Sequence, residues 1–385
     1  MSGSRIDRRS LLLAAGLLPL AEGASAATPR AEGQPLLGNP NLPEPPGKRA
    51  RWAVVGLGTY AVGQMLPAFQ ASDRAVLTAF VSGNPQKARD LGARYGVGKF
   101  YDYGSFDSIA GDDKIDCVYI ALPVALHAEY VIRALKAGKH VLCEKPMAST
   151  SAECEAMIAA ARGANRQLGV AYRVHFEPNN ADAIRRLQAG EIGVLRHVSG
   201  DAGFNADPSY PPHKWRLQKA LAGGGSMYDI GIYALNACLW AAGEEPVSVS
   251  AVYSTPANDP RFAEVEGGVE WRLRFASGIS AQGSSSYAYH YNSRQTLFGS
   301  VGNILLSPSM DYNDIRMTVV HSDFTSQPLR AGNASDQFGG QINAFSQAAL
   351  ANRPHQTPGE MGLRDIRLIE AIYRSANADG AIVKL

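Results

Sequence analysis

Residues 51–61 decide the fold, and they read Arg51-Trp52-Ala53-Val54-Val55-Gly56-Leu57-Gly58-Thr59-Tyr60-Ala61. The first part is a short apolar run of the kind that forms a strand. The second part matches the G-x-G-x-x-A pattern, in which Gly56 allows a tight turn, Gly58 lets the backbone approach a pyrophosphate, and Ala61 allows close helix packing. Apolar residues at helical spacing follow, namely Val62, Met65, Leu66 and Phe69. The stretch therefore predicts a dinucleotide-binding unit whose helix N-terminus faces the phosphates.

Strand-like and helical segments keep alternating beyond this unit. The pattern predicts a helix over residues 127–137 and further strands over residues 76–81, 116–122, 140–143 and 169–172. Such alternation is typical of a doubly wound parallel sheet, in which ligands lie beyond the carboxyl ends of the strands. We therefore expect a Rossmann domain over residues 49–172.

The pattern changes from about residue 177. Short strand-like runs separated by turn signals become frequent, at residues 247–253, 268–275, 279–287, 295–298 and 315–321. Helices are expected over residues 337–351 and 361–378, the second of them returning to the first domain. The fold class predicted is α/β plus α+β, with a mostly antiparallel sheet domain over residues 173–385.

The N-terminus has the features of an export signal. The pair Arg8-Arg9 stands directly before the apolar run 11–18, which is too short to span a bilayer, and Ala24-Ser25-Ala26 supplies a cleavage pattern. The paired arginines favour twin-arginine export over an ordinary Sec signal, although Asp7 stands where such signals usually carry Ser or Thr. We expect a signal peptide over residues 1–26 and a periplasmic mature protein. Because this route carries folded proteins, a cofactor taken along should be held tightly.

A proline-rich arm follows over residues 27–48. Its five closely spaced prolines exclude a helix and favour extended chain: Pro35, Pro40, Pro43, Pro45 and Pro46. Two interpretations remain open for this arm, a free linker and a segment that packs on a partner subunit.

Composition excludes several classes of protein. The chain has 385 residues, 45% of them hydrophobic, and a net charge of +2, which gives no electrostatic case for binding nucleic acid or a membrane surface. Length and composition indicate a soluble protein of two domains. Four dispersed cysteines form no C-x-x-C pair, so we expect buried free thiols and no metal site: Cys117, Cys143, Cys154 and Cys238.

The end of the second strand indicates which nucleotide is preferred. An NAD-binding protein usually places Asp or Glu there, against the ribose 2′-hydroxyl. This chain instead reads Ser82-Gly83-Asn84-Pro85-Gln86-Lys87. Ser82 and Lys87 can bind a 2′-phosphate, so NADP is favoured, the alternative being that Lys87 is a solvated helix residue.

Glu144-Lys145-Pro146 stands at the end of a later strand. Pro146 biases Lys145 towards an extended conformation and can itself follow a cis bond. That geometry would project the ammonium group into the ligand crevice. From spacing alone, a surface lysine after a strand is an equal interpretation.

The run from Ala137 to Pro146 resembles the E-K-P signature of the glucose–fructose oxidoreductase/inositol dehydrogenase family, also called Gfo/Idh/MocA. The similarity extends from about Arg51 to the C-terminus. It is carried further by Leu122-Pro123, Leu126-His127, Trp215-Arg216, Gly223-Gly224-Gly225-Ser226, Asp229-Ile230-Gly231-Ile232-Tyr233, Gly243-Glu244-Glu245-Pro246 and Pro358-Gly359-Glu360. Most members have His in place of Tyr233, whereas the glucose–fructose oxidoreductase branch has Tyr.

The resemblance implies a sugar oxidoreductase with tightly bound NADP. It would oxidise an aldose at C1 to the aldonolactone and reduce a second sugar, fructose or an aldose, to the alditol by ping-pong hydride transfer. An open-faced sheet would pair subunits into a homodimer or homotetramer. Two alternatives stay open, an ordinary NADP-dependent sugar or inositol dehydrogenase with exchangeable cofactor and a non-catalytic exported sugar- or NADP-binding protein.

Lys145, Asp229 and Tyr233 are the predicted catalytic residues. Asp229 and Tyr233 stand four positions apart, which puts both on one helical face. Tyrosine alone is a poor base because its usual pKa is about 10, but a nearby ammonium such as Lys145 would lower that pKa. The alternatives are a capping box formed by Ser226 with Asp229, and a Tyr233 ring that simply packs in the core.

Other side chains are candidates for binding. Tyr287 and Tyr289 belong to an aromatic cluster suited either to a sugar pocket or to sheet packing and an interface. The predicted substrate-binding residues are Lys145, Arg173, Asp229, Tyr233, Tyr287 and Tyr289. The predicted cofactor-binding residues are Gly56, Leu57, Gly58, Thr59, Tyr60, Ala61, Ser82, Gly83, Lys87, Tyr103, Ala121, Leu122, Pro123, Leu126, His127, Glu144, Lys145, Arg173, Trp215 and Arg216.

Overall fold

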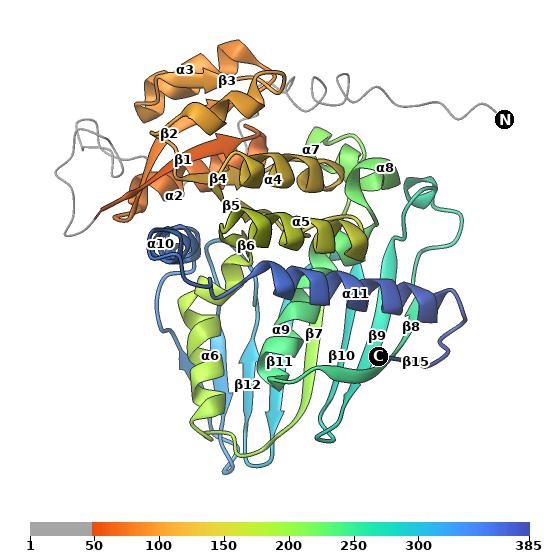
Figure 1. Ribbon diagram of the computed structural model, residues 1–385. Helices are drawn as coiled ribbons and strands as arrows, with labels where there is room; N and C mark the ends of the chain where they lie inside the picture. Colours follow the sequence, from red (N-terminus) through yellow and green to blue (C-terminus); the bar gives the residue numbers. More distant parts are fainter. Residues whose placement is uncertain (1–47) are drawn as a thin grey trace.

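Two sheets organise the computed structural model, which describes residues 48–385. Sheet A lies in the upper part of Figure 1 and sheet B in the lower part, with helices between them. The expected signal peptide and nearly all of the expected proline-rich arm lie outside the described residues. No helix among the described residues is both long and apolar enough to cross a membrane.

Sheet A is wholly parallel, with the order β3-β2-β1-β4-β5-β6. Its strands are β1 (Ala50–Val55), β2 (Ala75–Val81), β3 (Lys99–Tyr101), β4 (Cys117–Ile120), β5 (His140–Cys143) and β6 (Leu168–Val170). The strand order reverses between β1 and β4, which is where a doubly wound sheet binds its ligand. The predicted Rossmann domain is confirmed.

Helices cover both faces of sheet A. They are η1 (Ala61–Met65), α2 (Leu66–Ala71), α3 (Pro85–Tyr95), η2 (Phe106–Gly111), η3 (Val124–Leu126), α4 (His127–Lys136) and α5 (Ser151–Ala164). Helices α4 and α5 lie side by side on one face (Figure 1). The other face is covered by α2 and by α10 (Asp336–Leu350), which comes from the far end of the chain. Trp52 of β1 marks this contact, because its Nε1 donates to Ser346 Oγ at 3.0 Å.

Sheet B has the order β14-β13-β12-β11-β7-β10-β9-β8-β15, and only the β7–β10 pair is parallel. Its strands are β7 (Leu195–Asn205), β8 (Pro246–Tyr253), β9 (Gly268–Phe275), β10 (Ser280–Ser286), β11 (Ala288–Gly299), β12 (Asn303–Leu306), β13 (Met317–Val320), β14 (Ser326–Leu329) and β15 (Val383–Lys384). The mostly antiparallel sheet is therefore confirmed, although the sequence pattern missed its central strand β7.

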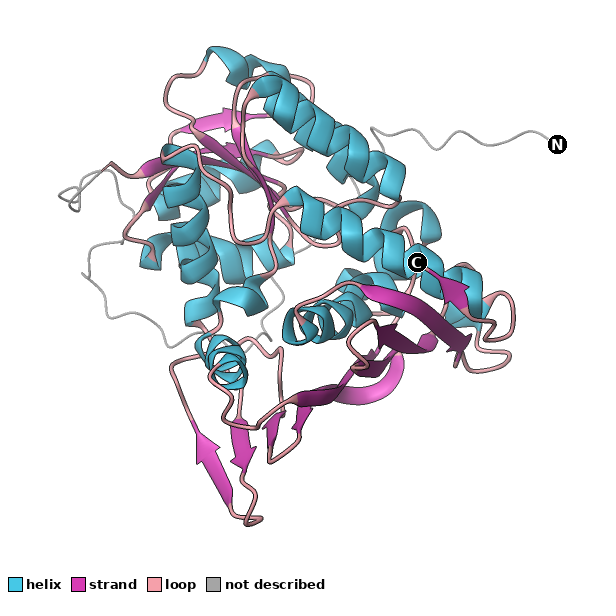
Figure 2. Ribbon diagram, turned by 60° about the horizontal axis from the view of Figure 1, so that its bottom comes forward, coloured by secondary structure: helices cyan, strands magenta, loops and turns pink. Residues whose placement is uncertain are grey.

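Further helices belong to the second half of the chain, and α9 and α11 among them pack on one face of sheet B (Figure 2). They are η4 (Arg173–Phe176), α6 (Pro178–Gln188), α7 (Pro211–Lys214), η5 (Trp215–Leu217), α8 (Lys219–Ala222), η6 (Met227–Gly231), α9 (Ile232–Ala242), η7 (Pro260–Phe262) and α11 (Gly359–Ala376). Helix α9 packs on β7 at Gly200, where a Cβ would come within 3.2 Å of Ala234 O. The other face holds a groove of about 500 Å³, lined in part by Trp271 and Tyr289.

Helix α11 crosses the middle of the molecule and contacts both halves (Figure 1). It packs on α5 and β6 of the first domain and on β8 and α9 of the second. Ser151, at the start of α5, donates its backbone N–H to Glu370 of α11 at 2.8 Å. This C-terminal helix thus contacts elements of both halves of the chain. All four cysteines are buried and free, as expected from their spacing.

Candidate active site

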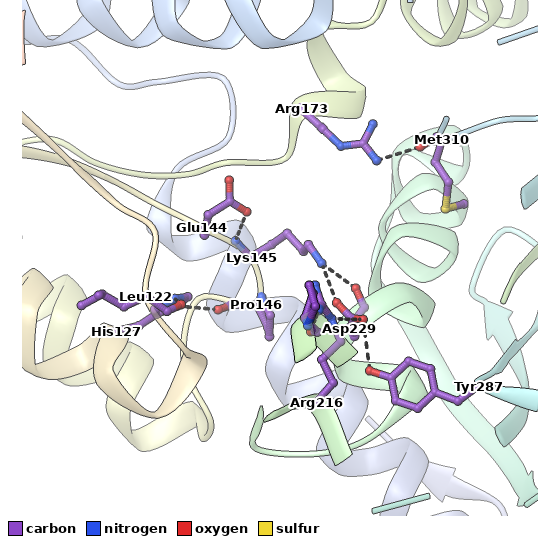
Figure 3. A network of polar contacts seen from close by, with 11 residues as sticks. Leu122, His127, Glu144, Lys145, Pro146, Arg173, Arg216, Asp229, Tyr287 and Met310 are labelled. Carbon is purple, nitrogen blue, oxygen red and sulfur yellow. Dashed lines mark hydrogen bonds and ion pairs between the residues drawn. The ribbon is translucent and has the colours of Figure 1, made fainter. Parts of the chain in front are cut away.

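The predicted site residues of the first domain gather at one edge of sheet A. They follow the carboxyl ends of all six strands, and in a parallel sheet these ends meet at the same edge. Lys145 is the second residue after the end of β5, and its bond to Pro146 is cis. Its ammonium donates to the backbone oxygen of Asp229 at 2.6 Å and lies 3.3 Å from Asp229 Oδ1 (Figure 3). Lys145 therefore reaches from the first domain to the second.

Asp229 is the centre of the polar network in Figure 3. One carboxylate oxygen faces Lys145, while the other accepts from Arg216 Nε at 2.8 Å and from the Tyr287 hydroxyl at 3.1 Å. Burial acts to raise the pKa of Asp229, but Arg216 and Lys145 outweigh it and hold the pKa at about 2. Asp229 is thus an ionised carboxylate that fixes two cations.

The capping-box interpretation of Asp229 is wrong. Ser226 has helical backbone angles and makes no capping hydrogen bond. Its hydroxyl instead lies 3.0 Å from Ser285 Oγ on sheet B. Since Asp229 lies in the π-helical turn η6 with its carboxylate on Lys145 and Arg216, its role is in the site and not at the helix cap.

Tyr233 lies at the start of α9, four residues beyond Asp229, and is 9% exposed. The Lys145 ammonium lies 4.7 Å from its ring centroid and the Arg173 guanidinium lies 4.8 Å from it. Burial raises the pKa of Tyr233 to about 12, with Arg173 opposing the rise. The expectation of a lowered pKa is therefore wrong, because burial raises the pKa by more than the neighbouring positive charge lowers it. Tyr233 is a neutral phenol near pH 7.

Arg173 is buried between the two domains, with 2% exposure. One of its terminal nitrogens donates to Gln337 Oε1 and the other donates to Met310 O at 2.7 Å. Its guanidinium also lies 4.5 Å from the ring centroid of Tyr312. The third nitrogen, Nε, is buried without a partner among the described residues.

Tyr312, Met310 and Gln337 were missed by sequence reasoning. The first two belong to the irregular segment between β12 and β13, and Gln337 lies in the first turn of α10. No periodicity or motif singles out these positions. Only the folding of sheet B and α10 onto the first domain brings them to Arg173.

Glu144 lies behind Lys145 and is 8% exposed. It accepts hydrogen bonds from the Tyr119 hydroxyl of β4 and from the Lys145 backbone N–H, the latter at 3.2 Å. Burial raises its pKa, with Tyr119 acting in the opposite direction. The Tyr60 hydroxyl, close enough for its pKa to be affected by Glu144, is buried without a hydrogen-bond partner in the described part of the chain. An unpartnered buried hydroxyl beside a ligand crevice indicates a place for a ligand atom or water.

The turn after β1 fits a dinucleotide. Gly56 has a φ of +90°, and a Cβ there would lie 2.4 Å from Ala121 O, so only glycine fits. Gly58 has open space where a Cβ would stand, which leaves room for a pyrophosphate. Leu57 and Ala61 are buried under this turn. The remaining predicted contacts at this turn and the adjacent end of β4 are Thr59, Leu122 and Pro123.

The turn after β2 fits a 2′-phosphate. Asn84 caps α3 by accepting from the Lys87 backbone N–H at 3.0 Å, while its own N–H donates to Ser82 Oγ at 3.1 Å. Gly83 lies between them. The Lys87 ammonium is partly buried, which lowers its pKa, and it has no hydrogen-bond or ion-pair partner within residues 48–385. A partly buried ammonium without a partner is suited to binding an anion. This environment favours a phosphate-binding role for Lys87 over the alternative of a solvated helix residue.

Three further predicted cofactor contacts have structural partners. His127 is 1% exposed, and its ring nitrogens lie 2.9 Å from Pro146 O and 2.8 Å from Leu122 O (Figure 3). The His127 ring thus connects the segment after β4 with the segment after β5, and both of its ring nitrogens are used in these contacts. Leu126 is buried beside it. Tyr103 packs edge-on against Tyr130, with ring centroids 5.5 Å apart.

Tyr287 and Tyr289 do not share one pocket. Tyr287 is buried beside Asp229, whereas Tyr289 lines the groove on the opposite face of sheet B. The alternation expected of a strand fails because Tyr287 stands between β10 and β11, and β11 is bulged directly after Ala288. Ala288 pairs with Asn205 but Asn292 pairs with Gly203, so β11 contains two extra residues. The prediction that Tyr289 belongs to the substrate site is therefore wrong.

Trp215 and Arg216 close the site from the side of η5. The Arg216 guanidinium lies 4.8 Å from the Trp215 ring centroid while it holds Asp229. Among residues 48–385, no group of three or more His, Cys, Asp or Glu side chains could hold a metal ion. Ionised Asp229, the two cations bound to it and the neutral Tyr233 therefore lie together, in an arrangement that is chemically capable of proton transfer.

Comparison with known proteins places this geometry in a family. Residues 50–172 match the model of an oxidoreductase family with an NAD-binding Rossmann fold, and residues 181–305 match that of the GFO/IDH/MocA C-terminal domain. The chain is 30% identical to D-xylose 1-dehydrogenase [NADP(+)] of Haloarcula marismortui over 86% of this chain and 92% of that protein. It is 28% identical to 1,5-anhydro-D-fructose reductase of Ensifer adhaerens, over 85% and 96%.

Solved structures agree with this assignment. Aldose-aldose oxidoreductase from Caulobacter crescentus, complexed with glycerol, is 40% identical with a TM-score of 0.83 over 88% of this chain and 100% of that one. A 3-ketoreductase from Actinomadura kijaniata, in complex with TDP-benzene and NADP, is 27% identical with a TM-score of 0.75 over 85% and 98%. The chain therefore belongs to the GFO/IDH/MocA family of NAD(P)-dependent sugar oxidoreductases.

Proposed function

We propose that the protein oxidises an aldose such as glucose at C1 to the aldonolactone and reduces a second sugar, an aldose or fructose, to the alditol. The observation that carries this proposal is the convergence of Lys145, Asp229 and Tyr233 at the nucleotide edge of sheet A. The likeness to an aldose-aldose oxidoreductase over its full length supports the sugar class.

Tyr233 is the proton carrier in this proposal. A bound nicotinamide supplies the hydride acceptor for one half-reaction and the hydride donor for the other. Since the pKa of Tyr233 is about 12, its hydroxyl is protonated and can give its proton to the carbonyl oxygen of the sugar being reduced. The phenolate left behind is favoured by the nearby Arg173, and it recovers a proton from the C1 hydroxyl of the sugar being oxidised.

Lys145 and Asp229 orient the substrate. An ammonium group has three donors, and Lys145 uses two of them on Asp229. The third is free to donate to a sugar oxygen beside Tyr233. Because Asp229 is fixed by Arg216 as well, the ammonium is held in place before the sugar binds.

We further propose that NADP stays bound through both half-reactions and that the protein acts in the periplasm. The unpaired Lys87 and the absence of a carboxylate directly after β2 support NADP. The twin-arginine pattern supports export of a folded, loaded protein. One site serving both sugars gives ping-pong kinetics. Subunits would pair through the helix-free face of sheet B, where the groove lies.

A second candidate is an NADP-dependent sugar dehydrogenase with exchangeable cofactor. The 30% identity to D-xylose 1-dehydrogenase [NADP(+)] favours it. The two candidates share the chemistry of Tyr233 and differ in whether the nucleotide leaves.

The absorbance of the reduced nicotinamide separates these candidates. Purified mature protein is mixed with glucose alone, without added nucleotide. A stoichiometric rise that a second sugar reverses is expected for bound NADP and the two-sugar cycle. A rise only when NADP is supplied would favour the exchangeable-cofactor dehydrogenase. No rise with any sugar tried, with or without NADP, would contradict both and leave a binding protein.

A further inference from the structure

Glu266 precedes β9 and lies against the start of the segment that carries Asp229. Its Oε2 accepts the backbone N–H of Gly225 at 2.8 Å, and its Oε1 accepts that of Met227 at 3.0 Å. The Tyr373 hydroxyl of α11 donates to the same Oε1 at 2.7 Å. One carboxylate therefore connects the glycine-rich turn, η6 and the C-terminal helix.

These hydrogen bonds do the work of a helix cap. The first N–H groups of a helical segment have no partner within it and are usually satisfied by the side chain of the capping residue. Ser226 does not act in this way, because its hydroxyl is directed to Ser285. Glu266 satisfies the N–H of Met227, the first residue of η6, from a position 39 residues further along the chain, and it also accepts the N–H of Gly225 just before this segment. Its negative charge suits a helix N-terminus.

Glycines make this contact possible. A Cβ at Gly225 would lie 2.0 Å from Glu266 O and 2.8 Å from its carboxyl carbon. A Cβ at Gly224 would lie 2.6 Å from the Tyr373 hydroxyl. Gly225 therefore packs against Glu266 and Gly224 against Tyr373, so both positions require glycine for protein packing.

Hydrogen bonds provide the charge compensation that Glu266 has. Among the described residues, Glu266 forms no ion pair. Its charge raises the pKa of four nearby tyrosine hydroxyls, those of Tyr228, Tyr253, Tyr287 and Tyr373. A carboxylate balanced only by directed N–H and O–H groups is strict about where those groups lie. The position of η6 is thereby coupled to Glu266.

We propose that Glu266 is a positioning residue, whose carboxylate fixes the start of the segment bearing Asp229 and Tyr233, with Tyr373 tying this anchor to α11. Its effect on turnover rests on the proposed function. Its effect on the local structure does not.

Glu266→Gln tests the proposal. The amide keeps the shape but turns one acceptor oxygen into an NH₂ group that must face an N–H or O–H donor. We expect kcat to fall roughly tenfold to a hundredfold through misplacement of Asp229 and Tyr233. The Kd of NADP should stay unchanged, since the glycine cradle does not touch Glu266. Tyr373→Phe should cause a smaller loss, because the carboxylate keeps both backbone hydrogen bonds.

Glu370→Gln is the matched control. Glu370 also accepts hydrogen bonds at a helix start, from Ser151 N and Ser151 Oγ at 2.8 Å each, but α5 carries no catalytic residue. This variant should keep its kcat. An equal loss in both variants would reduce Glu266 to a general stability effect and overturn the proposal.

Hydrogen exchange over residues 225–233 makes the result independent of the substrate. We expect faster exchange of these amides in Glu266→Gln and unchanged exchange in Glu370→Gln. This result would establish the anchor even if the wild-type protein oxidised no sugar. A wild-type protein that oxidises no sugar would contradict the proposed function and leave the anchor intact. Unchanged exchange would overturn the anchor. Faster exchange with full kcat would overturn its role in turnover.

Discussion

Tyr233 shows how a residue's surroundings change its expected chemistry. The sequence predicted that Lys145 lowers the pKa of Tyr233, whereas burial raises this pKa to about 12 and keeps the side chain a neutral phenol. We predict that Tyr233→Phe binds NADP with unchanged affinity and loses about 10²–10⁴ in kcat, the range for a lost general acid or base. Steady-state kinetics and nucleotide titration measure the two quantities.

Tyr289→Phe is the control for this loss. It removes the same hydroxyl from a ring on the opposite face of sheet B, where the groove lies, and should keep wild-type turnover. Retention of more than roughly a tenth of the wild-type kcat by Tyr233→Phe would remove this residue from proton transfer.

Asp229 makes a pH-dependent contribution to stability. Its pKa falls from 3.8 to about 2 in the folded protein, so the contribution is full above about pH 4 and is lost as pH falls towards 2. Asp229→Asn leaves Lys145 and Arg216 without their counter-ion and should cost about 1–3 kcal/mol near neutral pH. Denaturant unfolding at several pH values should show this difference shrinking in acid, and a constant difference would contradict the assignment.

Lys87 should set the preference between nucleotides. Its partly buried ammonium has no partner among the described residues, and no carboxylate follows β2 directly. We expect Lys87→Ala to weaken NADP about tenfold relative to NAD, the size of one charge-assisted hydrogen bond. Binding of both nucleotides to the stripped protein measures the ratio. An unchanged ratio would show that the turn after β2 does not read the 2′-phosphate.

At the scale of elements, the turn after β1 offers a pair of glycine substitutions with different outcomes. Gly56→Ala combines a φ of +90° with a contact of 2.4 Å to Ala121 O, so it should lower the melting temperature and NADP affinity together. Gly58→Ala meets no protein atom within 4 Å and should weaken NADP alone. Thermal unfolding without nucleotide separates the two. Equal melting temperatures would contradict the strain at Gly56.

The elements that sequence predicted best are those whose pattern is local. Five strands of sheet A were predicted because each is a mostly apolar run next to a turn or helix signal, as in residues 52–55. Strand β3 was not predicted, because Lys99–Tyr101 is short and largely exposed. Strand β7 was missed because small and polar residues such as Gly200, Asp201 and Gly203 interrupt its alternation. Those glycines are explained by α9 and Tyr289, which pack against them from distant parts of the chain.

The same distinction holds for the site. Lys145 and Asp229 stand in short motifs, so sequence could name them. Tyr312 and Glu266 act through contacts over long sequence separations, with Arg173 and with the start of η6 respectively. Their neighbours in the chain carry no sign of these contacts. The two extra residues in β11, which lie between Ala288 and Asn292 around Tyr289, likewise follow from pairing with β7 and not from local composition.

At the scale of the whole molecule, the C-terminal helices prevent the first domain from being an independent unit. Phe345 of α10 packs on Trp52 with ring centroids 5.5 Å apart, and Asn343 accepts from the Ser72 hydroxyl at 2.6 Å. Helix α11 adds the Glu370 contacts with Ser151 at the start of α5. Part of the core of sheet A is thus supplied by the last part of the chain. Domains joined only by a small polar interface would move and unfold separately, but this interface includes fully buried aromatic rings.

We therefore predict a single cooperative unfolding transition for both domains. In calorimetry of the nucleotide-free protein, the measured enthalpy should equal the van't Hoff enthalpy. Added NADP, though bound at sheet A, should raise the melting temperature of that whole transition, because it stabilises the one folded state. Ser346→Ala, which removes the partner of Trp52 Nε1, should lower the same transition without splitting it. Two resolved peaks, of which NADP shifts only one, would show that α10 and α11 do not couple the domains.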